Sequence, residues 1–155
     1  MKRKIEILLL ALVILLTSGC NSIQKLKNIR VTSATIDSVT PTGFRSLDAK
    51  LLIGLDNPAM QFTIEDISGV LYYKAKPYVD FSAEPVTVKA KTAAVYELNA
   101  SAFLKPEVTL LEVMRLAKNY DLADFTIDIN ATVKLRSGVG KALTFKDMNL
   151  KDLME

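Results

Sequence analysis

The chain of 155 residues contains no histidine and no tryptophan, and its single cysteine is Cys20. Without histidine there is no imidazole to bind a metal or to act as the general base of a nucleophilic serine. A single cysteine cannot form an intramolecular disulfide. The serines occur in no Gly-x-Ser-x-Gly sequence. These absences predict a protein that is not an enzyme, with no catalytic residues, no bound metal and no cofactor.

Long apolar runs are also missing. The longest, residues 7–16, has ten residues, whereas a membrane-spanning helix needs about 20. The run follows Lys2, Arg3 and Lys4 and ends in small residues, which is the layout of a cleavable secretory signal. The sequence therefore predicts export from the cytoplasm.

The end of this signal, Leu16-Thr17-Ser18-Gly19-Cys20, resembles the lipobox of bacterial lipoproteins. The resemblance implies cleavage between Gly19 and Cys20 and attachment of lipid to Cys20. Each buried CH₂ of an acyl chain contributes about 0.8 kcal/mol, and two chains give a stable anchor. We therefore expect a signal peptide over residues 1–19, a lipidated tether over 20–28 and a domain over 29–155. The expected location is the bacterial cell envelope, facing the periplasm, at the outer rather than the inner membrane.

The charge of the chain is nearly balanced, with 20 basic and 17 acidic residues and a net charge of +3. Removal of residues 1–19 leaves 17 and 16. Nucleic-acid binding needs a concentration of basic residues on one face, so we expect no nucleic-acid partner. We also expect no small-molecule substrate.

From residue 29 onward the dominant hydrophobic period is two, which is typical of strands with one face in a core. Residues 47–56 and 125–136 alternate most regularly, and turn residues such as Pro41, Asn57-Pro58 and Ser137-Gly138 separate the strands. Weaker alternation predicts six further strands, at residues 29–40, 63–74, 79–82, 86–91, 94–103 and 142–150. Residues 107–120 instead show helical spacing, with Pro106 in the first turn. The expected fold is all-β, an immunoglobulin- or fibronectin-like antiparallel sandwich of two sheets with one helical insertion.

An alternating strand that ends in Asn57-Pro58 resembles the type 2 late-embryogenesis-abundant family, also described as the WHy domain. The segments "ISGVLYYKAKPYVDF", "EPVTVKAKTAAVYELNAS" and "DFTIDINATVKL" are similar to later strands of that family. Ala75 stands where the family usually has glycine in a turn. The resemblance covers residues 29–150 and implies an immunoglobulin-like sandwich, a role in desiccation or stress tolerance, and no catalytic residues.

Asn57 and Pro58 form the sharpest motif, with a structural and a binding interpretation. Proline holds Asn57 out of the helical region, and the amide can bond to nearby backbone where the strand ends. The structural interpretation is the favoured one, against contact with a ligand.

The aromatic residues Tyr72, Tyr73, Tyr78 and Phe81 lie on one predicted hairpin. Part of this group is expected to face outward, where aromatic side chains favour contact with a partner. The alternative is packing across the strands, with the tyrosine hydroxyls in water.

Four acidic residues are candidates for a cation or acid–base site: Glu65, Asp66, Asp121 and Asp124. Adjacent strand residues point to opposite faces, so Glu65 and Asp66 converge only if a bulge intervenes. No Asp-x-Asp-x-Asp-Gly calcium loop is present.

The sequence favours a non-enzymatic, membrane-anchored module that binds an unknown envelope protein or polymer through strand edges, loops or the tyrosine hairpin. Two alternatives remain. One is general protection during desiccation or stress, and the other is carriage of a lipid or apolar ligand.

Overall fold

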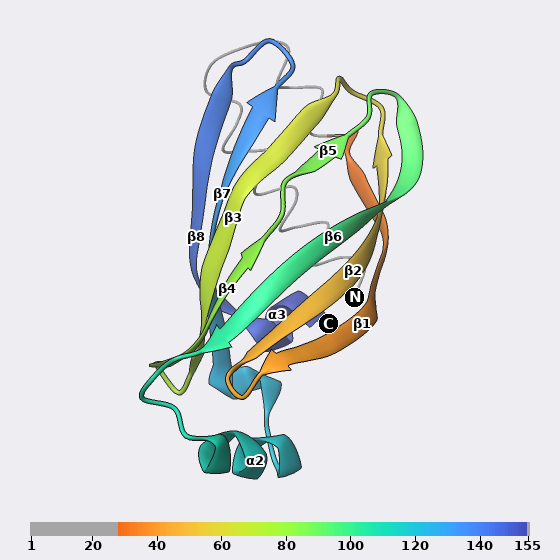
Figure 1. Cartoon of the computed structure of the whole chain (residues 1–155). Coiled ribbons are helices and arrows are strands. Elements are labelled where there is room, and N and C mark those ends of the chain that lie inside the picture. The colour runs from red at the N-terminus through yellow and green to blue at the C-terminus, as the bar shows by residue number, and fades with distance from the viewer. Residues whose placement is uncertain (1–27, 155) are drawn as a thin grey trace.

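The computed structural model describes residues 28–154. The predicted signal peptide, the cleavage at Gly19 and the lipid on Cys20 lie outside these residues. The described part is mostly antiparallel β-structure with short helices (Figure 1). In chain order the elements are β1 (Arg30–Gly43), β2 (Ser46–Asn57), β3 (Phe62–Tyr73), β4 (Lys76–Ala83), β5 (Val86–Val88), β6 (Thr92–Leu104), α2 (Leu110–Lys118), η2 (Leu122–Asp124), β7 (Phe125–Leu135), β8 (Gly140–Asn149) and α3 (Leu150–Met154).

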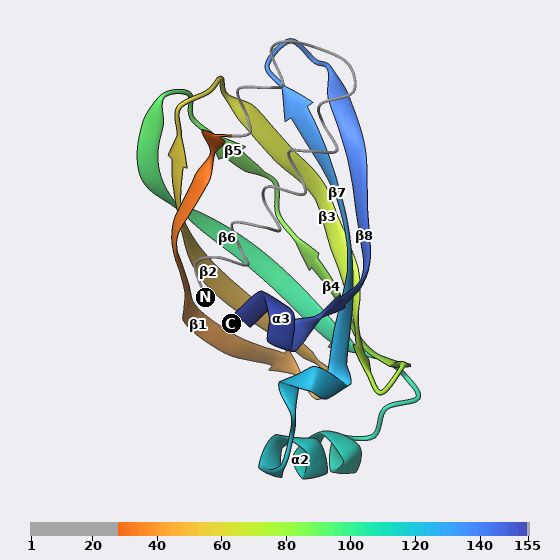
Figure 2. The same ribbon diagram turned by 180° about the vertical axis from the view of Figure 1, so that it is seen from behind.

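The strands form the predicted antiparallel sandwich, which confirms the fold class. One layer holds β1, β2 and β6, and the facing layer holds β3, β7 and β8 (Figures 1 and 2). The sequence predicts two separate sheets, and this part of the prediction is wrong. The two layers belong to one sheet, because β4 pairs with β3 on one side and with β6 on the other. The order β1-β2-β6-β4-β3-β7-β8 is therefore one continuous sheet folded onto itself.

The main buried cluster lies at the end of the sandwich where β1 begins. It combines Val31 and Leu55 from one layer with Phe62 and Val133 from the other, and Val88 of β5 is fully buried among them. These residues are the inward members of the alternating patterns, so the period of two correctly identified the core face.

The opposite end of the sandwich is filled by aromatic rings. Tyr73 packs against Tyr78 with ring centroids 5.7 Å apart and against Phe125 at 5.1 Å. Tyr78 and Phe125 are buried. The packing interpretation of this hairpin is therefore what the geometry shows for Tyr73 and Tyr78.

Helix α2 begins three residues later than the sequence pattern indicates. Thr109 is its N-cap and forms a capping box with Glu112, so Pro106 lies before the helix rather than in its first turn. Val108, which the pattern placed on the apolar side of the helix, precedes the cap and is fully buried. The side-chain cap at Thr109 satisfies backbone donors that the predicted start would have left unpaired.

The β3–β4 turn consists of Lys74 and Ala75, both with left-handed backbone, at φ 48° and 64°. Two-residue hairpin loops of this kind favour Asn-Gly, because the left-handed region costs a residue with a Cβ about 1–2 kcal/mol. Ala75 is therefore strained.

Asn57 is fully buried at the end of β2. Its amide nitrogen donates to the carbonyls of Met60 and Lys89 at 3.0 and 2.9 Å, and its oxygen accepts from the backbone N–H of Ala59 at 2.9 Å. Both amide hydrogens are used within the fold, while Pro58 is exposed. The geometry supports the structural interpretation of the motif.

Replacement of Ala75 by glycine should raise the free energy of unfolding by about 1 kcal/mol, because glycine adopts φ > 0 without strain. Chemical denaturation measures the change. The matched control is Ala93→Gly in β6, an exposed alanine without positive φ, which should lower stability. A loss of stability in Ala75→Gly would contradict the assignment of strain.

Asn57→Ala should lower the free energy of unfolding by about 2–4 kcal/mol, because it removes the hydrogen bonds of one buried N–H and two partly buried carbonyls. The same denaturation measurement tests this, with Asn130→Ala as the control on an exposed asparagine. Equal effects of the two substitutions would contradict the structural role.

Candidate functional site

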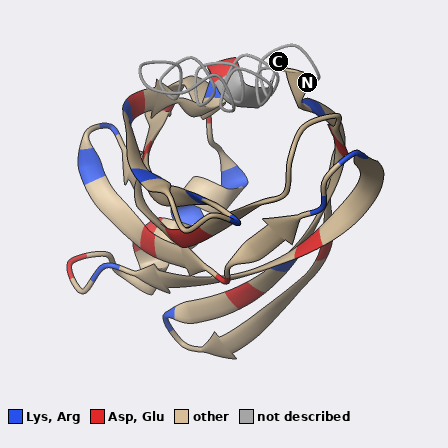
Figure 3. Cartoon of the chain, turned by 90° about the horizontal axis from the view of Figure 1, so that it is seen from above, with Lys and Arg blue, Asp and Glu red and all other residues tan. Residues whose placement is uncertain are grey.

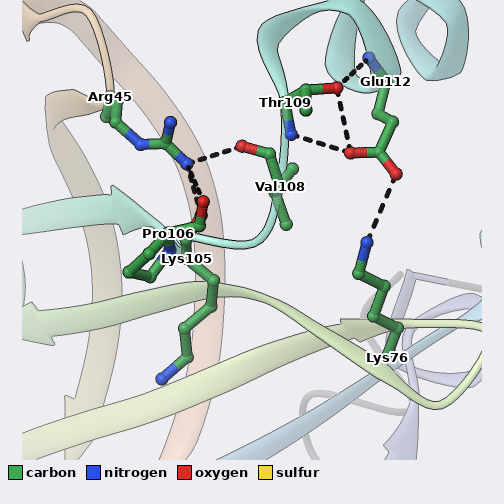
Figure 4. A network of polar contacts seen from close by, with 7 residues as sticks. All are labelled: Arg45, Lys76, Lys105, Pro106, Val108, Thr109 and Glu112. Atoms are coloured by element: carbon green, nitrogen blue, oxygen red, sulfur yellow. Dashed lines mark hydrogen bonds and ion pairs between the residues drawn. The ribbon is translucent and has the colours of Figure 1, made fainter.

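Helix α2 is attached to the end of the sandwich by polar contacts (Figure 4). Arg45, in the β1–β2 turn, directs one guanidinium nitrogen at the carbonyls of Lys105, Pro106 and Val108, at distances of 2.5 to 3.1 Å. The segment from 105 to 108 is thereby held in a tight curve against Arg45. An always-charged donor suits this place, because three converging carbonyl dipoles stabilise a cation.

The inner side of α2 is fixed by Glu112. Its carboxylate accepts from the Thr109 backbone N–H at 2.7 Å and pairs with the Lys76 ammonium at 3.2 Å (Figure 4). The backbone and hydroxyl of Thr109, and then Lys76, lower the pKa of Glu112 below its usual value. One carboxylate thus joins the start of α2 to the β3–β4 hairpin.

Beside this hairpin, Lys105 makes an ion pair with Asp80, and Lys74 makes one with Asp124. The Lys105 ammonium lies 2.7 Å from Asp80, and that hydrogen bond raises the pKa of Lys105. Burial raises the pKa of the Tyr78 hydroxyl. The Lys74 ammonium lies 5.4 Å from the centre of the Tyr73 ring.

The four aromatic residues predicted as partner contacts are separated by the structure. Tyr73 and Tyr78 point into the end cluster, and Phe81 is half-buried next to Gly69. Tyr72 is on the outer face, where its hydroxyl lies 3.3 Å from Asp128. A role in partner contact remains a prediction for these residues, and little of the Tyr78 ring is accessible to a partner.

The outer side of α2 is apolar and exposed. Leu110, Leu111 and Met114 are exposed, as are Arg115 and Lys118 beside them. We call these five side chains the α2 face. None of the helix residues is fully buried. Leu110, Leu111 and Met114 are turned to solvent, whereas Val113 and Leu116 are half-buried, and Leu116 lines a shallow hollow with Tyr73 and Tyr78 of the hairpin. The sequence pattern identified the stripe but gave no signal for its direction.

A second exposed apolar region lies along β1. Within residues 28–154, β1 pairs only with β2 and is therefore an edge strand. Ile36 and Val39 lie opposite Leu51 and Ala49 on the inner face, yet they are 68% and 54% exposed. We call the segment from Ser33 to Pro41 the β1 edge. The sequence predicts strand edges as binding elements without selecting this one.

On the outer face, a shallow groove of about 530 Å³ crosses β1, β2, β6 and β4. Four of its polar side chains are hydrogen-bonded to one another. Ser101 donates to Asp48 at 2.7 Å, and the Asn99 amide donates to Glu84 at 2.9 Å. The groove contains no aromatic side chain against which a ligand could stack.

The acidic residues considered from sequence have separate structural contacts. A bulge does intervene after Glu65, since Asp66 has φ 54° and the β3–β7 register shifts there, and Glu65 lies 3.6 Å from Lys134. Asp121 caps η2, and Asp124 lies 3.7 Å from the Lys74 ammonium. In the described part of the chain, no three acidic residues or cysteines are grouped as metal ligands.

Basic and acidic positions are interspersed around the strands when the sandwich is viewed from above (Figure 3). No helix between residues 28 and 154 is long and apolar enough to span a bilayer.

No protein-family model matches the chain, and no curated protein sequence matches it. Among solved structures, a protein from Archaeoglobus fulgidus is similar with a TM-score of 0.48 and 12% identity, over 75% of this chain and 96% of that one. The GAE domain of yeast GGA1 is similar with a TM-score of 0.29 and 11% identity, over 77% of this chain and 97% of that one.

The attachment of α2 should weaken at acidic pH. Because the pKa of Glu112 is lower in the folded protein, its contribution is present above its ordinary pKa and is lost as the pH falls through the folded value. Amide exchange over residues 110–118, corrected for the intrinsic rate, should therefore accelerate when the pH falls from 7 to 3.

Glu112→Gln should exchange faster at pH 7 and show a smaller change on acidification. Glu107→Gln, an exposed carboxylate just before the helix, should behave as the parent does. A pH response that is unchanged in Glu112→Gln would exclude this carboxylate as its cause.

Proposed function

We propose that this chain is a non-enzymatic, membrane-anchored binding module of the bacterial envelope that receives an extended segment of a partner protein at the β1 edge. One observation carries the proposal. Within the described residues β1 lacks a second neighbouring strand, and it exposes Ile36 and Val39 on the face that is otherwise turned into the sandwich.

Addition of a strand provides the binding mechanism. An edge strand presents unpaired N–H and C=O groups, and a partner in extended conformation satisfies them while its alternate side chains cover the apolar ones. A partner strand beside β1 would continue the sheet and remove Ile36 and Val39 from water. The hydrogen bonds would supply affinity, and the apolar contacts would favour a partner with alternating apolar residues.

The shape of β1 limits the length of such a partner. Its pairing with β2 shifts register between Ile36 and Ser38, and again towards each end of the strand. Bulges of this kind bend an edge and restrict indiscriminate pairing. Regular backbone remains from Ser33 to Ile36 and from Ser38 to Pro41. We therefore expect the partner to contribute one or two short stretches rather than a long strand.

The anchor is the predicted lipid on Cys20, which the resemblance to the lipobox supports. Strand β1, which begins at Arg30, starts at the end of the sandwich opposite α2 (Figures 1 and 2). The eight residue-to-residue steps from Cys20 to Asn28 extend at most about 28 Å. The anchor therefore keeps the β1 edge within a few nanometres of the membrane.

A photo-crosslinking amino acid in place of Ser38 tests the proposal in living cells, with adducts identified by mass spectrometry. We expect one dominant protein adduct, reduced at least tenfold by the pair Ile36→Lys and Val39→Lys, because lysine on an edge opposes strand addition. Since both side chains are exposed, each substitution should change stability by less than about 0.5 kcal/mol.

The matched control is Val95→Lys, which changes an exposed valine of β6 and should leave the adduct intact. Cys20→Ser should release the protein from the membrane and reduce the adduct. An adduct that persists in the double lysine variant would refute binding at the β1 edge, and a lipid adduct would instead support carriage of an apolar ligand.

A further inference from the structure

The α2 face lies at the end of the sandwich opposite the start of β1. It shares no residue with the β1 edge. Leu111 and Met114 are 58% and 62% exposed, and Leu110 is also exposed. A helix of nine residues is ordinarily stabilised by packing its apolar side on the protein. Here the polar contacts of Arg45 and Glu112 hold the helix, and Leu116 is half-buried on the side of the hairpin. Leu110, Leu111 and Met114 nevertheless remain exposed.

The acidic and basic residues of α2 differ in their pairing, and Arg115 lies at the flank of the α2 face, where it lines the same shallow hollow as Glu112. Its single acidic residue, Glu112, is turned inward and paired with Lys76. Its basic residues, Arg115 and Lys118, are exposed beside the apolar side chains, and neither has an ion pair within residues 28–154. The outward side therefore combines apolar surface with unneutralised positive charge.

Aromatic residues lie at the same end. Tyr120, just after α2, is exposed. Phe44 is 90% exposed in the turn that also supplies Arg45. Leucine, methionine and aromatic side chains flanked by basic residues are the composition of a helix that lies in the interface of a membrane. Tyrosine is enriched at that depth, where its ring is in the apolar region and its hydroxyl in water.

We propose that the α2 face binds the surface of an anionic lipid bilayer, with its apolar side chains among the acyl chains and Arg115 and Lys118 at the headgroups. Charge complementarity selects this occupant, since each basic residue near an anionic surface adds attraction. The inference does not depend on strand addition at the β1 edge.

The proposed anchor, on which the next step rests, gives this contact an orientation. The 14 residues of β1 extend about 46 Å, and the tether reaches about 28 Å from the other end. A sandwich held by both Cys20 and the α2 face therefore lies with its strands along the bilayer. This orientation would leave the sandwich unable to project freely into the periplasm.

The test uses the full lipidated protein, purified from its membrane and placed in vesicles of phosphatidylcholine with or without phosphatidylglycerol. A fluorophore on Met114→Cys reports contact with brominated lipids through quenching. With phosphatidylglycerol, quenching at 114 should be at least threefold stronger than at Val95→Cys, an exposed control on β6. Arg115→Gln with Lys118→Gln should reduce it to the control level.

Equal quenching at 114 and 95 would overturn the inference, as would quenching that is the same without phosphatidylglycerol. A protein adduct formed by a photo-crosslinker at Met114, without quenching, would assign the face to a protein partner instead. Labelling of the parent protein at Cys20 would show a free thiol and would contradict the proposed anchor. Quenching at position 114 would still test whether the α2 face contacts the bilayer.

Discussion

The pairing of β4 with β6 is the interaction on which the rest of the structure depends. Without it, the layers β1-β2-β6 and β3-β7-β8 would be held together only by side-chain packing and would expose two more strand edges. With it, main-chain hydrogen bonds cross from one layer to the other along Val79–Ala83. Consequently, within the described residues only β1 and β8 are edges of the main path.

The same continuity determines where α2 sits. The turn between β1 and β2 supplies Arg45, and the turn between β3 and β4 precedes Lys76, so the two layers each contribute one cation to the helix and the segment before it. Arg45 binds backbone carbonyls and Lys76 binds the carboxylate of Glu112, and neither contact requires an apolar residue of α2 to be buried. This division explains how a short helix keeps a defined position while Leu110, Leu111 and Met114 remain exposed.

Much of the fold could be predicted from the sequence, because burial on one face of a strand leaves a local trace in the period of two. The eight strands are predicted in this way, the helix from its spacing of three and four residues, and the turn at Asn57-Pro58 from its residue types. Pairing partners leave no such trace, so the sequence does not predict the bridge between β4 and β6.

Likewise, an apolar stripe shows that α2 has two faces but not which one meets the sandwich. The exposure of Ile36 and Val39 was hidden for the same reason, since their spacing matches that of core residues. The sequence also does not show whether a bulge separates Glu65 from Asp66, because that bulge depends on the pairing of β3 with β7.

The strained turn at Lys74 and Ala75 connects these features. Left-handed backbone at both positions is unfavourable without glycine, yet the tight turn brings Lys76 directly opposite Tyr73 and within reach of Glu112. The side chain of Lys74 partly offsets the strain through its contacts with Tyr73 and Asp124. A longer, relaxed loop would remove the strain but would free Lys76 from its register. Local backbone preference has thus been overruled by the need to hold the end of the sandwich that carries α2.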